Sequence, residues 1–291
     1  MNKIKVVFFG TPRFSVPFLK ALIDADFLDV MAVVTEPDRP AGRGKIMASS
    51  PIADFAEKNH LQILKPNRIM NNELRIMDFK PESIVVVAYG QIIPEKILKI
   101  PKYGAINVHP SDLPRYRGPA PIQAALLNGD KAMKVSVMQM DAKMDHGPVL
   151  DKLDIKIDEN DNYTTLEKKI LEKSPQFLIN TLKKYLNNEI KPQEQDHDKA
   201  TFTKMIKKED GLIGWGKSPI NIHNQIRAYC LWPKAYTFIG KKRLNILKSK
   251  IKSGKLKLEL VQLEGKKPVS WSDFKNGYRN LIPCEMIDKL E

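Results

Sequence analysis

The chain has 291 residues, 42% of them hydrophobic, and carries a formal net charge of +14. This length exceeds what a single hydrophobic core usually serves, which predicts two domains. No stretch reaches the roughly 18 consecutive apolar residues of a membrane span, and the apolar run at 6–9 is too short for a secretory signal. Two cysteines cannot form a disulfide framework in a chain of this size. We therefore expect a cytoplasmic protein with free thiols.

The positive charge is concentrated in the C-terminal third. Residues 201–291 contain 19 Lys and Arg against 8 Asp and Glu, whereas residues 1–200 contain 29 against 26. A lysine-rich composition that only keeps the surface soluble would give a high total. The uneven distribution instead favours an anionic partner for the C-terminal region.

Strands and helices alternate in the first half of the chain. The apolar run at 4–9 predicts a strand, and the spacing of apolar residues at 15–24 predicts a helix. Further strands are expected at 30–35, 61–64, 84–88, 105–108 and 135–140, and further helices at 51–59, which starts with a serine cap and Pro51, and at 120–128. This order predicts a doubly wound, parallel α/β sheet, which binds ligands beyond the carboxyl ends of its strands.

The pattern changes towards the C-terminus. Residues 167–187 predict one or two helices, with a break or a new first turn at Pro175. The polar segment 191–200 predicts a linker. Beyond it, short antiparallel strands are expected around Trp215, at 227–238 and at 255–263, separated by glycine turns.

These features predict a small β-barrel after the α/β domain. We expect a catalytic domain at 1–190, a linker at 191–206 and a C-terminal domain at 207–291. Within the barrel, Trp232 and Pro233 are expected in the core rather than as a platform for stacking bases.

Two common nucleotide sites are excluded by the motifs. Gly10-Thr11-Pro12 follows the first strand, where a dinucleotide fold needs three glycines, and proline stands where the second should be. There is no Walker lysine motif, so nothing indicates ATP. No Cys-x-x-Cys pair occurs, and we expect no metal.

The most informative segment is INVHPSDLPRYRG, at 106–118. Asn107 and His109 are two residues apart at the end of a predicted strand, so their side chains point the same way. An amide beside an imidazole can bind a carbonyl oxygen as it gains negative charge. Asp145 follows the strand VSVMQM, and a carboxylate near an imidazole can hold its orientation.

Each of these residues alone has a simpler explanation. A histidine after a strand is often structural, and an aspartate close before a glycine is often a turn residue. All three fall on one edge of one sheet, which favours a catalytic site. No serine or cysteine nucleophile is evident beside them, which favours direct attack by the substrate over a covalent acyl-enzyme.

The pair Asn107-x-His109 with the distant Asp145 resembles the catalytic set of the folate-dependent formyltransferases. Longer segments resemble the methionyl-tRNA formyltransferase family nearly end to end. These segments are FFGTP at 8–12, EPDRPAGRGK at 36–45, VVVAYGQIIP at 85–94, INVHPSDLPRYRGPAPIQ at 106–123, VMQMDAKMDHG at 137–147, KEDGLIGW at 208–215, NQIRAYCLWPKAY at 224–236 and LEGKKPVSWSDF at 263–274.

The resemblance implies a Rossmann-like catalytic domain and an OB-like C-terminal barrel that helps to hold tRNA. It implies transfer of the formyl group of 10-formyltetrahydrofolate to the α-amine of methionyl initiator tRNA, for translation initiation. Asn107 and protonated His109 would then stabilise the oxyanion. Asp145 would pair with His109 and help the proton to move.

The resemblance also implies binding residues. The folate loop corresponds to Ser111, Asp112, Leu113 and Pro114, although the family usually has leucine in place of Asp112. His146 and Pro148 also depart from the family, which often has threonine and aspartate there. The implied tRNA contacts are Arg39, Arg43 and Lys45 in the loop 38–45, and Lys241, Lys242 and Arg243 in the C-terminal domain, with Lys248, Lys250 and Lys252 as further candidates. We expect a monomer.

Other readings remain open at this point. A formyltransferase acting on glycinamide ribonucleotide or on a nucleotide sugar would share the three catalytic residues, but neither explains the basic region after residue 200. An RNA-binding protein with a relict enzyme domain would have the same charge pattern, but would have no chemical need for all three residues.

Overall fold

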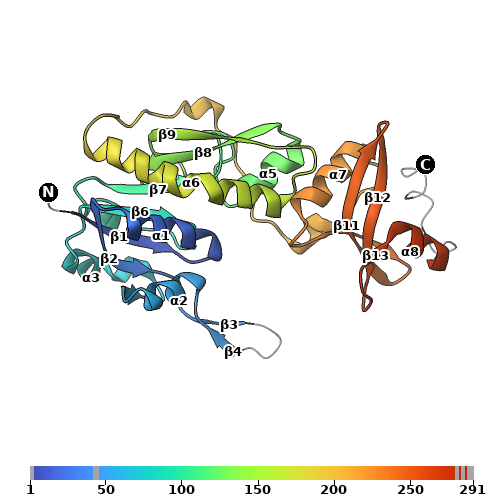
Figure 1. The fold of residues 1–291 in the computed structure, drawn as a ribbon, viewed down its shortest axis with the longest axis horizontal. Helices are drawn as coiled ribbons and strands as arrows, with labels where there is room; N and C mark the ends of the chain where they lie inside the picture. The colour runs from blue at the N-terminus through green and yellow to red at the C-terminus, as the bar shows by residue number, and fades with distance from the viewer. Residues whose placement is uncertain (1–2, 42–45, 279–281, 283–285, 287–291) are drawn as a thin grey trace. The chain divides into compact units, whose positions relative to one another are not determined.

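The computed structural model describes residues 3–41, 46–278, 282 and 286 (Figure 1). The chain divides into two compact units. Unit 1 comprises Met1–Arg117, Lys134–Asp154 and Ile170–Thr201, and unit 2 comprises Gly118–Met133, Ile155–Lys169 and Phe202–Glu291. The domain limits at 190 and 206 stay a prediction.

Unit 1 is built on a seven-stranded sheet with the order β5-β2-β1-β6-β7-β8-β9 (Figure 1). The strands are β1 (Ile4–Gly10), β2 (Leu28–Val34), β5 (Gln62–Leu64), β6 (Ser83–Val87), β7 (Ala105–His109), β8 (Ala132–Gln139) and β9 (Val149–Lys156). The strands from β5 to β7 run parallel, as predicted, but β8 runs antiparallel to β7. The sheet is therefore mixed, and the predicted α/β class is confirmed.

The central strands are buried along their whole length, which explains why β6 is continuously apolar after Ser83. Every residue of β6 and of β7 is buried. The helices of the first half are α1 (Val16–Asp24), α2 (Pro51–Lys58), α3 (Glu73–Asp78), α4 (Glu95–Leu98) and α5 (Pro121–Asn128). The predicted start of α2 is confirmed, because Ser50 Oγ accepts a hydrogen bond from the Ala53 amide at 3.1 Å.

The expected break at Pro175 is wrong. Helix α6 runs without interruption over Tyr163–Leu186 and contains Pro175. Its buried residues Ile170, Leu178 and Leu182 lie before and after the proline. Packing of this apolar face holds the helix together despite the hydrogen bond that proline removes.

Unit 2 contains a four-stranded antiparallel sheet, β10-β11-β12-β13. The strands are β10 (Ala235–Ile239), β11 (Lys242–Lys252), β12 (Lys255–Leu263) and β13 (Val269–Ser270), with helices α7 (Pro219–Ala228) and α8 (Trp271–Tyr278). The hairpin between β11 and β12 turns at Ser253 and Gly254, both with positive φ. The predicted antiparallel character of this region is confirmed.

Two predictions for unit 2 are wrong. The start of the expected strand at 227–238 belongs to α7, which runs to Ala228 and is capped by Ser218, whose Oγ accepts from the Asn221 amide. The Trp232 side chain is not in the core, because 56% of its surface is exposed. It lies in the turn between α7 and β10, outside the alternating pattern that would bury it.

The remaining elements are short. A two-stranded hairpin joins β3 (Arg39–Ala41) to β4 (Ile46–Ala48). Within the described part of the chain, every helix is too short or too polar to cross a membrane.

Candidate active site

The carboxyl end of β7 holds two of the three predicted catalytic residues. Asn107 and His109 are only 9% and 6% exposed, respectively. Because side chains alternate along a strand, the two lie on the same face, as the spacing predicts. An amide and an imidazole therefore stand side by side at the strand end, in surroundings with little access for water.

Both ring nitrogens of His109 face oxygen atoms. Nε2 lies 3.0 Å from the backbone oxygen of Tyr116. A carbonyl oxygen only accepts, so this contact assigns a hydrogen to Nε2. Nδ1 lies 3.7 Å from Asp145 Oδ1, a distance of ion pairing rather than of a hydrogen bond. The ring is therefore held between a carbonyl oxygen on one side and a carboxylate on the other, which fixes its orientation.

Asp145 lies in the loop between β8 and β9, in an unusual backbone conformation. Its φ is 50°, in the left-handed region that residues other than glycine rarely adopt. Nearby, a Cβ atom on Gly147 would lie 2.1 Å from the Gln139 backbone oxygen, so only glycine fits there. The loop is therefore tightly constrained around the carboxylate.

A buried polar network that the sequence did not reveal lies behind this loop. Gln195 Nε2 donates to the backbone oxygens of Asp145 at 3.0 Å and Gly147 at 2.6 Å. Gln195 Oε1 accepts from Arg117 Nε at 3.2 Å and Nη2 at 2.7 Å. Arg117 is 3% exposed, and Gln195 is 7% exposed. The only sequence signal was an arginine within the informative segment 106–118.

Two histidines border the same network. The His197 ring stacks on the His146 ring, with centroids 3.9 Å apart and an interplanar angle of 8°. His197 Nδ1 lies 2.9 Å from Arg117 Nη2, and His146 Nδ1 lies 2.6 Å from Asp141 Oδ2. His146, which departs from the family pattern, thus has its own carboxylate partner.

The predicted folate loop is held by hydrogen bonds of its own. Ser111 is fully buried, and its Oγ donates to the Arg115 oxygen at 2.7 Å. Asp112 Oδ1 pairs with Lys152 Nζ at 2.6 Å, and the same ammonium group donates to the Leu113 oxygen. The aspartate that replaces the family's leucine therefore has a lysine partner that offsets its charge.

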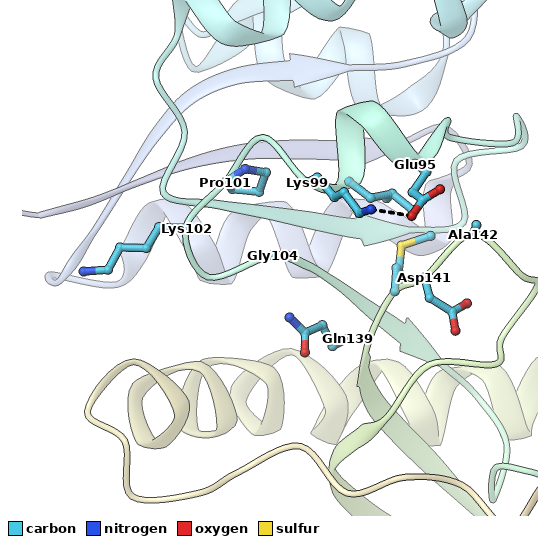
Figure 2. Close-up of a pocket in the computed structure, with 10 residues that line it drawn as sticks. Glu95, Lys99, Pro101, Lys102, Gly104, Gln139, Asp141 and Ala142 are labelled. Carbon is cyan, nitrogen blue, oxygen red and sulfur yellow. Dashed lines mark ion pairs between the residues drawn. The ribbon is translucent and has the colours of Figure 1, made fainter.

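A cavity of about 320 Å³ lies at the other end of β7. Its walls come from α4 and the residues after it, from Gly104 just before β7, and from residues 139–142. Figure 2 shows the α4 side of this cavity, where Lys99 Nζ pairs with Glu95 Oε1 at 2.6 Å. Gly104 runs directly into β7, and residue 142 lies three positions before Asp145. Two of the segments that line the cavity therefore continue along the chain into the segments that carry the catalytic residues.

Burial shapes the electrostatics at the end of β6. The Tyr89 side chain is 3% exposed, and its hydroxyl has no hydrogen-bonding partner among the described residues. Burial, and then the charge of Glu36, raise the pKa of Tyr89. This phenol therefore stays neutral at any physiological pH.

The predicted tRNA residues differ in their surroundings. Arg43 and Lys45 lie outside the described residues. Arg39 is well exposed, although its guanidinium pairs with Glu36 at 2.9 Å. Lys241 and Lys242 are exposed at the β10–β11 turn.

Arg243 is half-buried, unlike its lysine neighbours. It lies over the Tyr236 ring at 3.7 Å and donates to Asn245 Oδ1 and to the Pro233 oxygen. Its guanidinium group is therefore held by contacts within unit 2. Lys248 and Lys250 both pair with Glu259. No cluster of metal-ligating side chains occurs among the residues that the structure describes.

Comparison with known proteins identifies the family. Residues 2–182 match the formyl transferase family, and residues 205–257 match the formyl transferase C-terminal domain. The methionyl-tRNA formyltransferase of Caldicellulosiruptor saccharolyticus is 40% identical over 94% of this chain and 97% of its own length. That of Mesoplasma florum is 36% identical over the whole of both chains.

Solved structures support the fold. The methionyl-tRNA formyltransferase from Clostridium thermocellum superposes with a TM-score of 0.58 at 20% identity, covering 89% of this chain and 98% of that one. An N-formyltransferase from Helicobacter canadensis, in complex with folinic acid and dTDP-3-aminofucose, gives a TM-score of 0.64 at 19% identity over 88% and 90%. The sequence identities decide the assignment, and the chain belongs to the methionyl-tRNA formyltransferase family.

Proposed function

We propose that the chain transfers the formyl group of 10-formyltetrahydrofolate to the α-amine of methionyl initiator tRNA. The observation that carries this proposal is the pair Asn107 and His109 at the end of β7 with the Asp145 carboxylate 3.7 Å from the His109 ring, in a chain that methionyl-tRNA formyltransferases match along its length. The product is N-formylmethionyl-tRNA, used in translation initiation.

Asn107 and His109 act on the formyl oxygen. The methionyl amine attacks the formyl carbon, so a new carbon–nitrogen bond forms while the bond to the folate nitrogen breaks. As negative charge grows on the oxygen, the Asn107 amide and the protonated His109 ring stabilise it. Asp145 orients His109, and the amine's proton passes to the folate nitrogen.

The α-amine needs little activation. Free α-amines titrate near ~7.7–8.0, so an appreciable fraction is already neutral near neutral pH. The protein's task is then to hold amine and formyl carbon together and to exclude water from the formyl oxygen, since alignment alone supplies much of such rate enhancements. The burial of Asn107 and His109 suits that task.

The cavity beside α4 is our candidate for part of the donor site. Leu98 and Met140 give it apolar walls, and Gln139, Glu95 and Asp141 give it hydrogen-bonding groups. A flat, nitrogen-rich ring such as a pterin needs both. The loop of Ser111, Asp112, Leu113 and Pro114 remains a second proposed contact to the donor, through its backbone.

For tRNA, we propose that the exposed Lys241 and Lys242 contact phosphates, together with Arg39, Arg43 and Lys45 of the loop 38–45. Phosphate contacts position a nucleic acid without reading its bases. Arg243 contributes by fixing the turn that presents the two lysines. We further propose that the enzyme acts as a cytoplasmic monomer.

The test is direct. Purified protein is incubated with 10-formyltetrahydrofolate and methionyl initiator tRNA, and formyl-methionine is measured. Parallel reactions offer glycinamide ribonucleotide or an amino sugar nucleotide as acceptor. Formylation of the tRNA alone supports the proposal. Formylation of another acceptor, or tight tRNA binding without formylation, would overturn it.

A further inference from the structure

We propose that residues 193–201, predicted from sequence as linker, are a positioning element of the active site, in which Gln195 fixes Asp145 and Thr201 fixes Tyr116. The Tyr116 backbone oxygen and the Asp145 carboxylate are the oxygen atoms that flank the His109 ring. The inference rests on the proposed function, since it assigns roles to residues that act through the catalytic histidine and its carboxylate.

The Asp145 side of this element is a double hydrogen bond. The Gln195 amide nitrogen donates to the backbone oxygens of Asp145 and Gly147, two residues apart in the loop. A single donor group thus ties down the backbone on each side of His146. The segment is also paired to β9, because Gln193 and Val149 exchange two backbone hydrogen bonds of 2.8 Å.

The Tyr116 side is fixed by the other end of the segment. The Tyr116 amide donates to Thr201 Oγ1 at 2.8 Å, and the Arg117 amide donates to the Thr201 oxygen at 2.9 Å. The Thr201 amide in turn donates to the Pro114 oxygen at 3.2 Å. The carbonyl that accepts from His109 Nε2 is therefore held by a residue 85 positions later in the chain.

Arg117 joins the two sides. Its backbone is bonded to Thr201, and its buried guanidinium donates twice to Gln195 Oε1. The same guanidinium lies 2.9 Å from His197 Nδ1, so it contacts two side chains of the segment 193–201. The bidentate contact leaves Gln195 one orientation, with its amide nitrogen towards the Asp145 loop.

The hydrogen bonds from Gln195 hold the Asp145 loop in an uncommon backbone conformation. A left-handed backbone at a residue such as Asp145 is unfavourable and persists only when its surroundings hold it. The Asp145 carboxylate is 3.7 Å from His109 Nδ1, so a small relaxation of the loop would separate them. A misplacement of about 1 Å in an active site can cost about 10²-fold in rate.

Unit 2 contains a matched control. Gln225 is as buried as Gln195, and its amide nitrogen also donates to two backbone oxygens, those of Asp210 and Leu212. Its contacts are with backbone far along the chain from any catalytic residue. Unlike Gln195 Oε1, which accepts from Arg117, the buried Gln225 Oε1 has no hydrogen-bonding partner among the described residues. Gln225→Met removes the donor without burying an unpaired carboxylate, and so measures what the loss of these two hydrogen bonds does to stability alone.

The first variant is Gln195→Glu. It keeps an acceptor for Arg117 and gives that guanidinium a carboxylate partner, which preserves the fold. It removes the amide donor and places a carboxylate oxygen opposite two carbonyl oxygens, which loosens the loop. We expect kcat to fall about 10- to 100-fold, with KM for both substrates within about twofold of wild type. Gln225→Met should keep kcat.

A double-mutant cycle with Asp145→Ala separates positioning from general damage. If Gln195 acts through Asp145, then Gln195→Glu should change kcat less than about twofold once Asp145 is alanine. Multiplicative losses would overturn the inference while leaving the proposed function intact. Wild-type kcat in Asp145→Ala alone would overturn both. Wild-type kcat in Gln195→Glu would overturn the inference.

If Gln195→Glu does not fold, a variant at an exposed residue of the same segment tests the inference. Thr201 is exposed, and Thr201→Val keeps its shape while removing the acceptor for the Tyr116 amide. We expect a kcat about three- to tenfold below wild type, because the Tyr116 amide loses its protein acceptor at one side of His109. Thr201 is exposed, so water can replace that acceptor and the unfolding temperature should fall by at most a few degrees. A wild-type kcat in a folded Thr201→Val enzyme would overturn the inference.

Discussion

The proposed catalytic residues of unit 1 and the proposed tRNA-binding lysines of unit 2 differ in their exposure. In unit 1, Asn107, His109, Arg117 and Gln195 are nearly inaccessible to solvent. In unit 2, the lysines of the β10–β11 turn are exposed. Buried polar groups act through fixed geometry, because their hydrogen bonds are short and are strengthened where water is excluded. Exposed charges act through a field that salt weakens. Substitutions in unit 1 should therefore change turnover, and those in unit 2 should change tRNA affinity and its salt dependence.

The largest effect is expected from His109→Asn. Losing one group that stabilises the developing oxyanion usually costs ~10²–10³ in rate. We expect kcat to fall by that factor at saturating donor and tRNA, with tRNA affinity unchanged, as measured by formyl-methionine release and by filter binding. His60→Asn is the matched control, because His60 is exposed and its positive φ suits asparagine. A wild-type kcat in His109→Asn would remove the histidine from the mechanism.

A smaller effect, of a different kind, is expected in unit 2. Lys241→Gln with Lys242→Gln should weaken tRNA binding about threefold per lysine at low salt and reduce the salt slope by about one per lysine, with kcat unchanged. The control is Lys248→Gln with Lys250→Gln, since Glu259 already neutralises part of that charge. Equal losses from both pairs would mean that general charge, and not the turn, binds the tRNA.

Arg243 differs from its exposed lysine neighbours within a single turn. Its stacking on Tyr236 and its two hydrogen bonds predict that Arg243→Ala lowers the free energy of unfolding by about 1–2 kcal/mol. Urea titration measures this. Binding of tRNA, tested well below the midpoint of unfolding, should keep its salt slope. A reduced salt slope of tRNA binding without loss of stability would mean that Arg243 contacts a phosphate.

The sequence predicts best what is local. Asn107 and His109 could be paired because a strand's alternation is visible in a few residues, and α2 could be started correctly because Ser50 and Pro51 are adjacent. Gln195 could not be found, since its hydrogen bond to the Asp145 oxygen spans 50 positions. The polar composition around it is typical of a linker.

The same limit explains the errors in unit 2. Trp232 was expected in the core because large aromatics usually are. Its exposure depends on where α7 ends and β10 begins, which local composition does not fix. The helix α7 itself was missed because its buried residues include His223, Asn224 and Gln225, so its inner face lacks a clear apolar stripe.

His223 provides the smallest expected effect, on stability rather than on activity. The ring is buried, and Nδ1 lies 2.9 Å from Ser249 Oγ. Burial, and then the charge of Arg227, hold the pKa of His223 below its ordinary value of 6.5. The unfolded chain therefore binds a proton at this residue at pH values where the folded chain does not. The residue's contribution to stability is complete above pH 6.5 and is lost as the pH falls below it.

His223→Gln should flatten this part of the acid loss, because glutamine can keep a hydrogen bond to Ser249 but does not titrate. Thermal unfolding of wild type and variant between roughly pH 7.5 and pH 5.5 measures the difference. His60→Asn, in unit 1, should retain the full wild-type loss. If His223→Gln loses as much stability as wild type on acidification, the acid sensitivity originates elsewhere, and burial does not weaken proton binding by His223 in the folded chain.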